Sequence, residues 1–194
     1  MVTTPPRVRW KRQMASGGAG SYELPDDFFS RSEEERWLVV HAWGRPAPDP
    51  RSSAFRLALA GPFNARDPRA VPGLMRVAEE DPSIKVRRAA LMGLQRSEDR
   101  RTIPVLLNAL RSEDPASREH AILGLETLNA REGVPGLISI LDDPRQRTLA
   151  ARALVTIRDE RGLEPIRAAS KRGWPRSRRV LRALAAELAT AVGR

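Results

Sequence analysis

The chain has 194 residues, of which 41% are hydrophobic, 5% aromatic and 30% charged. That length allows one domain or one elongated array, and the hydrophobic fraction is enough for a packed core, which excludes a wholly disordered chain. Because there is no cysteine, a disulfide scaffold, a cysteine-ligated zinc site and a thiolate nucleophile are excluded. The few aromatics and the recurring Ala and Leu favour helices over a β-sandwich.

Positive charge is concentrated toward the C-terminus. The 34 basic and 24 acidic residues give a net charge of +10, and the last third, residues 131–194, holds 14 of the basic residues and 7 of the acidic ones. Only three basic residues are lysines, a bias typical of a GC-rich genome. The uneven placement nevertheless indicates a polyanionic or acidic partner near the C-terminus.

The first residues, MVTTPPRVRWKRQM, lack the apolar stretch of a secretory signal. No run in the chain approaches the roughly 18 apolar residues of a membrane span. We therefore expect a cytoplasmic protein with no membrane partner. Residues 1–20 end in a glycine-rich stretch and predict a flexible basic arm.

Residues 21–65 predict an N-terminal capping region that contains a degenerate repeat. Ser32 to Glu35 form a capping-box pattern, and the apolar spacing that follows, Trp37 and Val40, predicts the first helix of that repeat. The second helix is expected after Asp49-Pro50. We also expect Phe28 and Phe29 to dock back on the first helices.

Residues 66–194 contain an internal repeat of two helices per unit. Its last apolar position recurs in steps of 31, 32 and 31 residues, at Leu94, Leu125, Ile157 and Leu188. The first helix of each unit carries apolar residues at i, i+3 and i+7: Val71, Leu74, Ala78; Ile103, Leu106, Leu110; Val134, Leu137, Leu141; and, in the last unit, Leu163 and Ile166 before Ser170. The second helix carries them at i, i+4 and i+8: Val86, Ala90, Leu94; Leu149, Ala153, Ile157; Val180, Leu184, Leu188.

Short loops punctuate the units with Asp-Pro at 81–82, 114–115 and 143–144, and Trp174-Pro175 fills the fourth position. Aspartate caps the free N–H groups of a helix start, and proline is tolerated at the first helical position. We therefore expect each Asp-Pro pair to begin the second helix of its unit.

The aliphatic-Pro-x-Leu start, the Asp-Pro loop and the pattern Val-Arg-x-Ala-Ala-Leu-x-Gly-Leu at 86–94 resemble the short HEAT-like repeats first described in phycobilin lyases. The resemblance covers residues 66–189, and loosely 32–61. It implies an all-α fold, a right-handed α-α superhelix of four clear repeats plus one degenerate N-terminal repeat. The family includes lyase chaperones, adaptors, glycosylases and assembly scaffolds, so the resemblance is specific for fold and not for function.

No catalytic, metal or cofactor site is predicted. The glycines at 17–20 lack the lysine of a phosphate-binding loop, and the two histidines, His41 and His120, lie in different units. The HEAT-like DNA glycosylases use an acidic residue beside tryptophans, and their catalytic residues do not map onto this chain. We expect a non-enzymatic protein without a cofactor.

Two groups of basic residues are candidates for binding a partner or an anion. The first stands at the starts of second helices: Arg87, Arg88, Arg118 and Arg147. Each of these either pairs with a loop aspartate, which stabilises the repeat, or faces a ligand. The second group surrounds one tryptophan in a segment without acidic residues: Lys171, Arg172, Trp174, Arg176, Arg178, Arg179 and Arg182. It is either a solvated surface or a contact for an anionic partner.

The favoured function is that of an adaptor or scaffold that holds a partner protein on the concave face of the array. The alternative is nucleic-acid binding through the basic C-terminal third. A weaker alternative, implied by the resemblance, is a lyase-type chaperone of a tetrapyrrole-bearing protein.

Overall fold

The structure is a computed structural model that describes residues 24, 26–43 and 68–193. It divides into two compact units, Met1–Ser97 and Glu98–Arg194. Within the described residues there are helices and turns and no strands, so the predicted all-α repeat fold is confirmed. The predicted arm, and the helix expected after Asp49-Pro50, lie outside the described residues.

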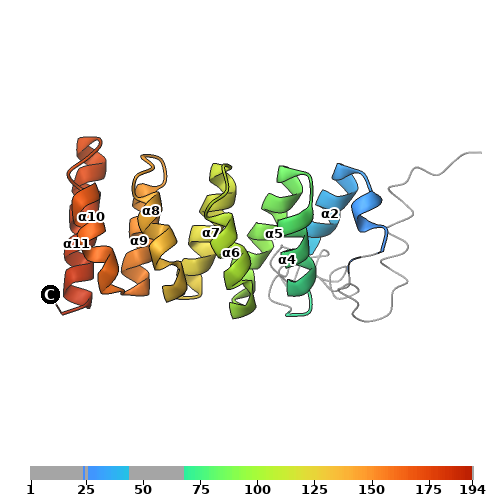
Figure 1. Ribbon diagram of the computed structural model, residues 1–194, viewed down its shortest axis with the longest axis horizontal. Helices are drawn as coiled ribbons and strands as arrows, with labels where there is room; N and C mark the ends of the chain where they lie inside the picture. Colours follow the sequence, from blue (N-terminus) through green and yellow to red (C-terminus); the bar gives the residue numbers. More distant parts are fainter. Residues whose placement is uncertain (1–23, 25, 44–67, 194) are drawn as a thin grey trace, which may run out of the picture. The chain divides into compact units, whose positions relative to one another are not determined.

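Among its described residues, the first unit contains the 3₁₀ turn η1 (Phe28–Ser30) and three helices, α2 (Glu33–Trp43), α4 (Val71–Glu80) and α5 (Ile84–Ser97) (Figure 1). The predicted capping box begins α2, where the backbone N–H of Ser32 donates to Glu35 Oε2 at 3.0 Å. Phe28 is fully buried, and the guanidinium of Arg76 on α4 lies 4.9 Å from the ring of Phe29. The predicted docking on a first helix is thus confirmed for Phe29, and Phe28 packs edge-on against the ring of Phe29.

Helix α2 takes a different place from the one predicted. Its apolar spacing predicts the first helix of a degenerate repeat, but α2 packs against α5, the second helix of the next pair. The second unit shows the same contact between consecutive second helices, α7 (Pro115–Thr127) with α9 (Arg147–Ile157). The prediction was wrong because first and second helices carry similar apolar spacings, and only the packing partner distinguishes them.

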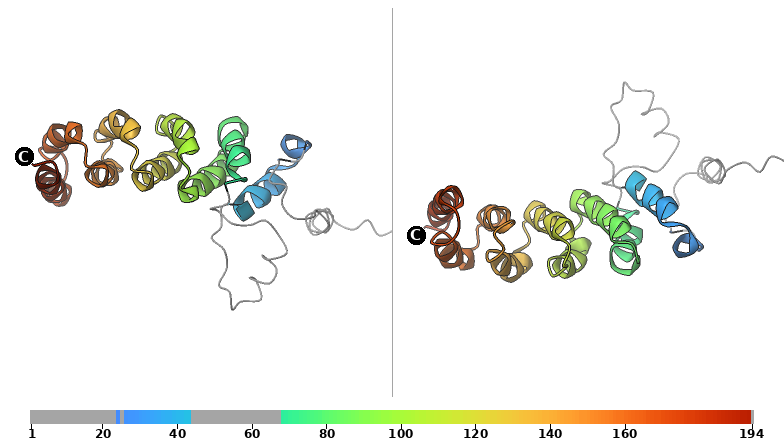
Figure 2. Two further views of the ribbon diagram at one scale, coloured as in Figure 1. Left: turned by 90° about the horizontal axis from the view of Figure 1, so that it is seen from below. Right: turned by 90° about the horizontal axis from the view of Figure 1, so that it is seen from above.

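The second unit consists of three helix pairs. They are α6 (Ile103–Ala109) with α7, α8 (Val134–Ile140) with α9, and α10 (Leu163–Ala169) with α11 (Pro175–Ala191). Each first helix follows a 3₁₀ turn, namely η2 (Arg100–Thr102), η3 (Arg131–Gly133) and η4 (Glu160–Gly162). Seen end-on in Figure 2, the first helices form one row of this unit and the second helices form the other.

The repeated apolar positions form the core. Leu94 in the first unit, and Leu125, Ile157 and Leu188 in the second, are each at most 1% exposed. The first-helix positions are also buried, except Ala78, which is half-buried. The second-helix register of α11 was predicted wrongly, because Val180 is 38% exposed while its neighbour Leu181 is fully buried. One residue along a helix turns a side chain by about 100°, so α11 buries Leu181 and Ala185 in place of the predicted Val180 and Leu184, together with the predicted Leu188.

The Asp-Pro pairs do not all begin helices as predicted. The pair Asp114-Pro115 does begin α7, since Pro115 is the first helical residue and the side chain of Asp114 accepts the N–H of Ser117 at 2.8 Å. Asp81 and Asp143 instead accept the N–H groups of Ser83 and Arg145, two residues on, in turns that precede α5 and α9. A short side chain can close such an Asx turn as readily as cap a helix, so the dipeptide marks the loop and not the helix start.

No helix among the described residues is long and apolar enough to cross a membrane.

Candidate functional site

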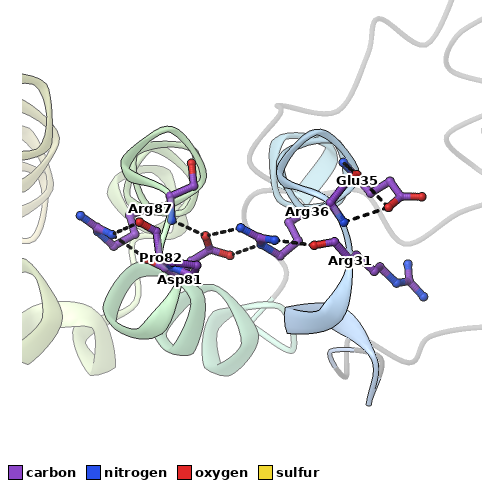
Figure 3. A network of polar contacts seen from close by, with 8 residues as sticks. Arg31, Glu35, Arg36, Asp81, Pro82 and Arg87 are labelled. Carbon is purple, nitrogen blue, oxygen red and sulfur yellow. Dashed lines mark hydrogen bonds and ion pairs between the residues drawn. The ribbon is translucent and has the colours of Figure 1, made fainter.

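The arginines at the starts of the second helices are held by loops. Nη1 of Arg87 donates to the carbonyl oxygens of Asp81 and Pro82, at 2.6 and 3.1 Å, and so satisfies the loop that precedes its own helix (Figure 3). Arg88 is half-buried and also has an interaction partner. These contacts support the interpretation of Arg87 as a residue that stabilises the repeat.

Arg118 on α7 joins two consecutive loops. Its Nη1 donates to the carbonyl oxygen of Ser112 at 2.8 Å, and its Nη2 donates to Asp143 Oδ2, in the next loop, at 2.8 Å. Its Nε donates to the side-chain oxygen of Gln146 at 2.8 Å. The N–H of Arg145, together with Arg118, holds the pKa of the Asp143 carboxyl below its ordinary value. Arg118 therefore has the loop-aspartate pairing that was one of its two predicted roles.

Arg147 on α9 is the most enclosed of the four, at 6% exposure. Its Nη2 donates to the carbonyl oxygen of Asp142 at 3.2 Å, and its Nη1 donates to that of Arg172, in the next loop, at 3.3 Å. Its Nε has no hydrogen-bond partner. Unlike Arg118, Arg147 reaches carbonyl oxygens alone and forms no ion pair with the described carboxylates.

The second candidate group surrounds the turn between α10 and α11. Trp174, directly before α11, is 82% exposed, and five basic residues beside it are also exposed; together we call these six the basic turn: Lys171, Arg172, Trp174, Arg176, Arg179 and Arg182. Arg172 forms an ion pair with Asp142 at 2.9 Å, with both side chains more than half exposed. Such an exposed pair is weak and can exchange for another anion.

Arg178, also predicted, differs from the basic turn. It is half-buried, and its Nε is buried without a hydrogen-bond partner. The neighbouring hydroxyl of Ser177 is likewise buried and without a partner. Ser177 was not predicted, because a single serine in a basic segment carries no sequence signal.

The second-helix face of this unit is mixed in charge. Thr156 Oγ1 on α9 donates to Glu126 Oε1 on α7 at 2.9 Å, which joins neighbouring helices across the face. An open hollow of about 590 Å³ lies between α9 and α11; its lining residues are Val155, Thr156, Arg158, Glu187, Thr190 and Ala191. Arg158 and Glu187 thus line the same hollow, so this part of the face carries both signs of charge. The basic residues of α11 all lie in the first half of the helix.

The described part of the chain forms no metal centre. No group of three His, Asp or Glu residues there is arranged to hold a metal ion. His120 lies on α7 in the second unit and His41 on α2 in the first. Of the acidic residues on the second helices, Glu119 and Glu126 lie on α7 and Glu187 lies on α11, and the tryptophan nearest in sequence to Glu187, Trp174, is at the opposite end of α11.

The repeats match a family model of HEAT repeats, once over residues 71–154 and once over 103–187. The two overlapping matches cover more than half of the chain. A comparison with curated proteins found no similar sequence. The predicted resemblance is therefore confirmed for the repeat type, and the phycobilin-lyase subtype stays a prediction.

Proposed function

Because the chain belongs to the family of HEAT-repeat proteins, we propose that it is a non-enzymatic adaptor that holds a partner protein. HEAT repeats generally mediate protein interactions and scaffolding, since stacked helix pairs build an extended surface. The partner is held on the second-helix face of the second unit and on the basic turn beside it. The observation that carries this proposal is the exposure of Trp174 among basic side chains, at a position that is aspartate in the other loops.

The charges favour this location over the rest of the repeat. Arg87, Arg118 and Arg147 donate to carbonyl and carboxylate oxygens of their own chain, so their charges serve the loops. The basic side chains of the basic turn are exposed, and of its members only Arg172 has an ion pair with a described residue. Exposed tryptophan and arginine are the residue types that most often dominate the energy of protein interfaces.

Nucleic-acid binding is the second candidate, and the same exposed tryptophan and cations favour it. Against it, the second-helix face continues from the basic turn into Glu187 on α11 and Glu126 on α7, which would repel a phosphate backbone. A protein partner can place an acidic segment on the basic turn and a surface with charges of both signs on the second-helix face. The lyase-type chaperone rests on the resemblance alone.

Site-specific photo-crosslinking in the native host tests the adaptor proposal. A photoreactive residue is placed at Arg152 on α9 or Arg179 on α11. The matched controls carry it at Asn108 on α6 or Ser139 on α8, which are also exposed but lie on first helices. We expect one protein to crosslink from the second-helix positions and not from the controls, and to bind the purified chain in a calorimetric titration. Crosslinks from the first helices alone, or no binding by the purified partner, would contradict the proposal.

A further inference from the structure

The starts of α7 and α11 have the same sequence plan with one difference. Each helix begins with proline, at Pro115 and Pro175, and each has serine two residues later. At α7 the residue before the proline is Asp114, whose Oδ2 accepts both the N–H of Ser117, at 2.8 Å, and its hydroxyl, at 2.7 Å. At α11 that residue is Trp174, which makes no side-chain cap hydrogen bond.

Two side-chain polar atoms at the start of α11 are buried without partners. The hydroxyl of Ser177, which corresponds to that of Ser117, is buried and unpartnered, and so is Nε of Arg178. A buried polar atom without a partner destabilises the fold unless something supplies the missing hydrogen bond. The free N–H groups of the first turn and the positive end of the helix dipole also favour a negative group at this position.

A second, independent observation comes from α9. Arg36 and Arg118 each donate to a carbonyl oxygen of the loop before their own helix and to a carboxylate of the following loop, Asp81 and Asp143. Arg147, more than nine-tenths buried, reaches toward the turn before α11 in the same way but finds the carbonyl oxygen of Arg172 in place of a carboxylate. Its Nη1 lies only 2.8 Å from where a Cβ on Gly173 would stand, so its guanidinium lies directly against this turn.

The turn before α11 is open to solvent. Residues 171–176 are all exposed, and the side chain of Trp174 projects into solvent. Arg176 and Arg179 stand on the first two turns of α11, where they attract an anion from solution. A ligand can therefore approach the turn from solvent, and it reaches the buried hydroxyl of Ser177 when the side chains that cover this atom move.

We infer that the start of α11 binds a carboxylate side chain from an acidic segment of a partner protein. That carboxylate takes the role that Asp114 has at α7: it accepts the N–H and hydroxyl of Ser177 and lies beside the charges of Arg147 and Arg178. Trp174 packs against an apolar residue of the same segment. The inference rests on the proposed adaptor function for the class of its partner, and it adds the chemistry by which the partner is recognised.

The test uses the full chain and a short synthetic peptide of alternating Asp and Ser with one central Leu. Binding is measured by fluorescence anisotropy, and the amide signals of Arg176 and Ser177 are followed by NMR during the titration. We expect saturable binding that shifts these two signals. Ser177→Ala should weaken binding about tenfold, since it removes a hydrogen bond to a charged group.

Two substitutions of Trp174 separate the cap from the aromatic ring. Trp174→Asp and Trp174→Asn each supply an internal cap, and Asn does so without a charge; both should abolish peptide binding and raise the melting temperature by about 2–4 °C. Trp174→Ala removes the ring and leaves the cap position open, so it should weaken binding without a rise in melting temperature. Arg111→Ala, an exposed charge removed elsewhere in the same unit, is the matched control and should bind like the parent chain.

Each outcome decides the inference. Peptide binding that survives in Trp174→Asp and Trp174→Asn overturns the helix-start site, while the adaptor function still stands or falls by the crosslinking experiment. If an oligothymidine binds and the peptide does not, the ligand of this site is a nucleic acid and not an acidic segment. The affinity for the oligothymidine should then fall by about 0.9 log units per phosphate contact for each tenfold rise in salt concentration. Failure of both ligands to bind also overturns the inference.

Discussion

Arg36 on α2 and Asp81 at the end of α4 form a buried ion pair between residues 45 positions apart. Nε of Arg36 donates to Asp81 Oδ2 at 2.7 Å and its Nη2 to Oδ1 at 3.1 Å, while its Nη1 donates to the carbonyl oxygen of Arg31 (Figure 3). The side chains are 8% and 0% exposed. Asp81 also accepts the N–H of Ser83, so one carboxylate closes the loop before α5 and fixes α2 beside it.

Breaking this pair should destabilise the first unit strongly. Asp81→Asn leaves the guanidinium of Arg36 buried without a counter-charge, and a loss of about 3–5 kcal/mol in the free energy of unfolding is expected. Hydrogen exchange of the α2 and α5 amides measures this loss within the unit. Glu80→Ala is the matched control, because its pair with Arg76 is more than half exposed on both sides and should contribute at most about 1 kcal/mol. Equal protection in the two variants would contradict the expectation.

Leu125 tests the continuous core of the second unit. It is fully buried on α7, and Gly133 approaches it so closely that a Cβ there would lie 3.0 Å from Leu125 Cδ1. Leu125→Ala should therefore lower the free energy of unfolding by about 2–5 kcal/mol through loss of contacts and formation of a cavity. Denaturant unfolding monitored by circular dichroism measures it. A change near zero would show that the repeat has no shared core at this position.

The sequence predicted the repeat because burial recurs with the helical period. Leu94, Leu125, Ile157 and Leu188 mark the same position in four pairs, and each is buried as the spacing required. The burial of these positions depends on contacts within a helix pair of about thirty residues, and a periodic sequence pattern encodes such contacts directly.

Contacts between distant positions could not be predicted in the same way. Arg36 and Asp81 are separated by a long segment with no fixed spacing, so nothing in the sequence pairs them. The hydroxyl of Ser177 has no hydrogen-bond partner, and Trp174 cannot supply the carboxylate that Asp114 supplies at α7. This difference is seen only when α11 is compared with α7 in three dimensions. The candidate site was thus predicted as a charged segment, and its geometry was not.

The corrected register of α11 makes a prediction about two neighbouring residues. Leu181 is fully buried and Val180 is 38% exposed, although the i, i+4, i+8 spacing had placed Val180 in the core. Leu181→Ala should cost about 2–5 kcal/mol, whereas Val180→Ala should stay within about 0.5 kcal/mol. Thermal melting of the two single variants compares them directly. A larger loss for Val180→Ala than for Leu181→Ala would restore the register expected from the sequence.

Acid should weaken the second unit through aspartates that begin its 3₁₀ turns. Asp99 before η2 and Asp159 before η4 each accept the N–H and guanidinium of the arginine two residues on, Arg101 and Arg161. The side-chain hydrogen bond from that arginine is the main cause that lowers the pKa of each carboxyl below its ordinary value of 3.8. A carboxyl whose pKa is lower in the folded state stabilises the fold above the unfolded pKa.

The contribution of these two carboxylates to the free energy of unfolding should therefore be complete above about pH 4. It should be lost as the pH falls through their lowered pKa values in the folded state. In Asp159→Asn, one titrating group is gone, so the free energy of unfolding should start lower at neutral pH and decline less steeply toward pH 2 than in the parent chain. Urea unfolding at a series of pH values measures both slopes. If the free energy of unfolding of the two proteins declines in parallel with falling pH, Asp159 has the same pKa in the folded and unfolded chain, which would contradict this expectation. The carboxylate of Asp159 is largely buried beside Arg161, and this position predicts different pKa values in the two states.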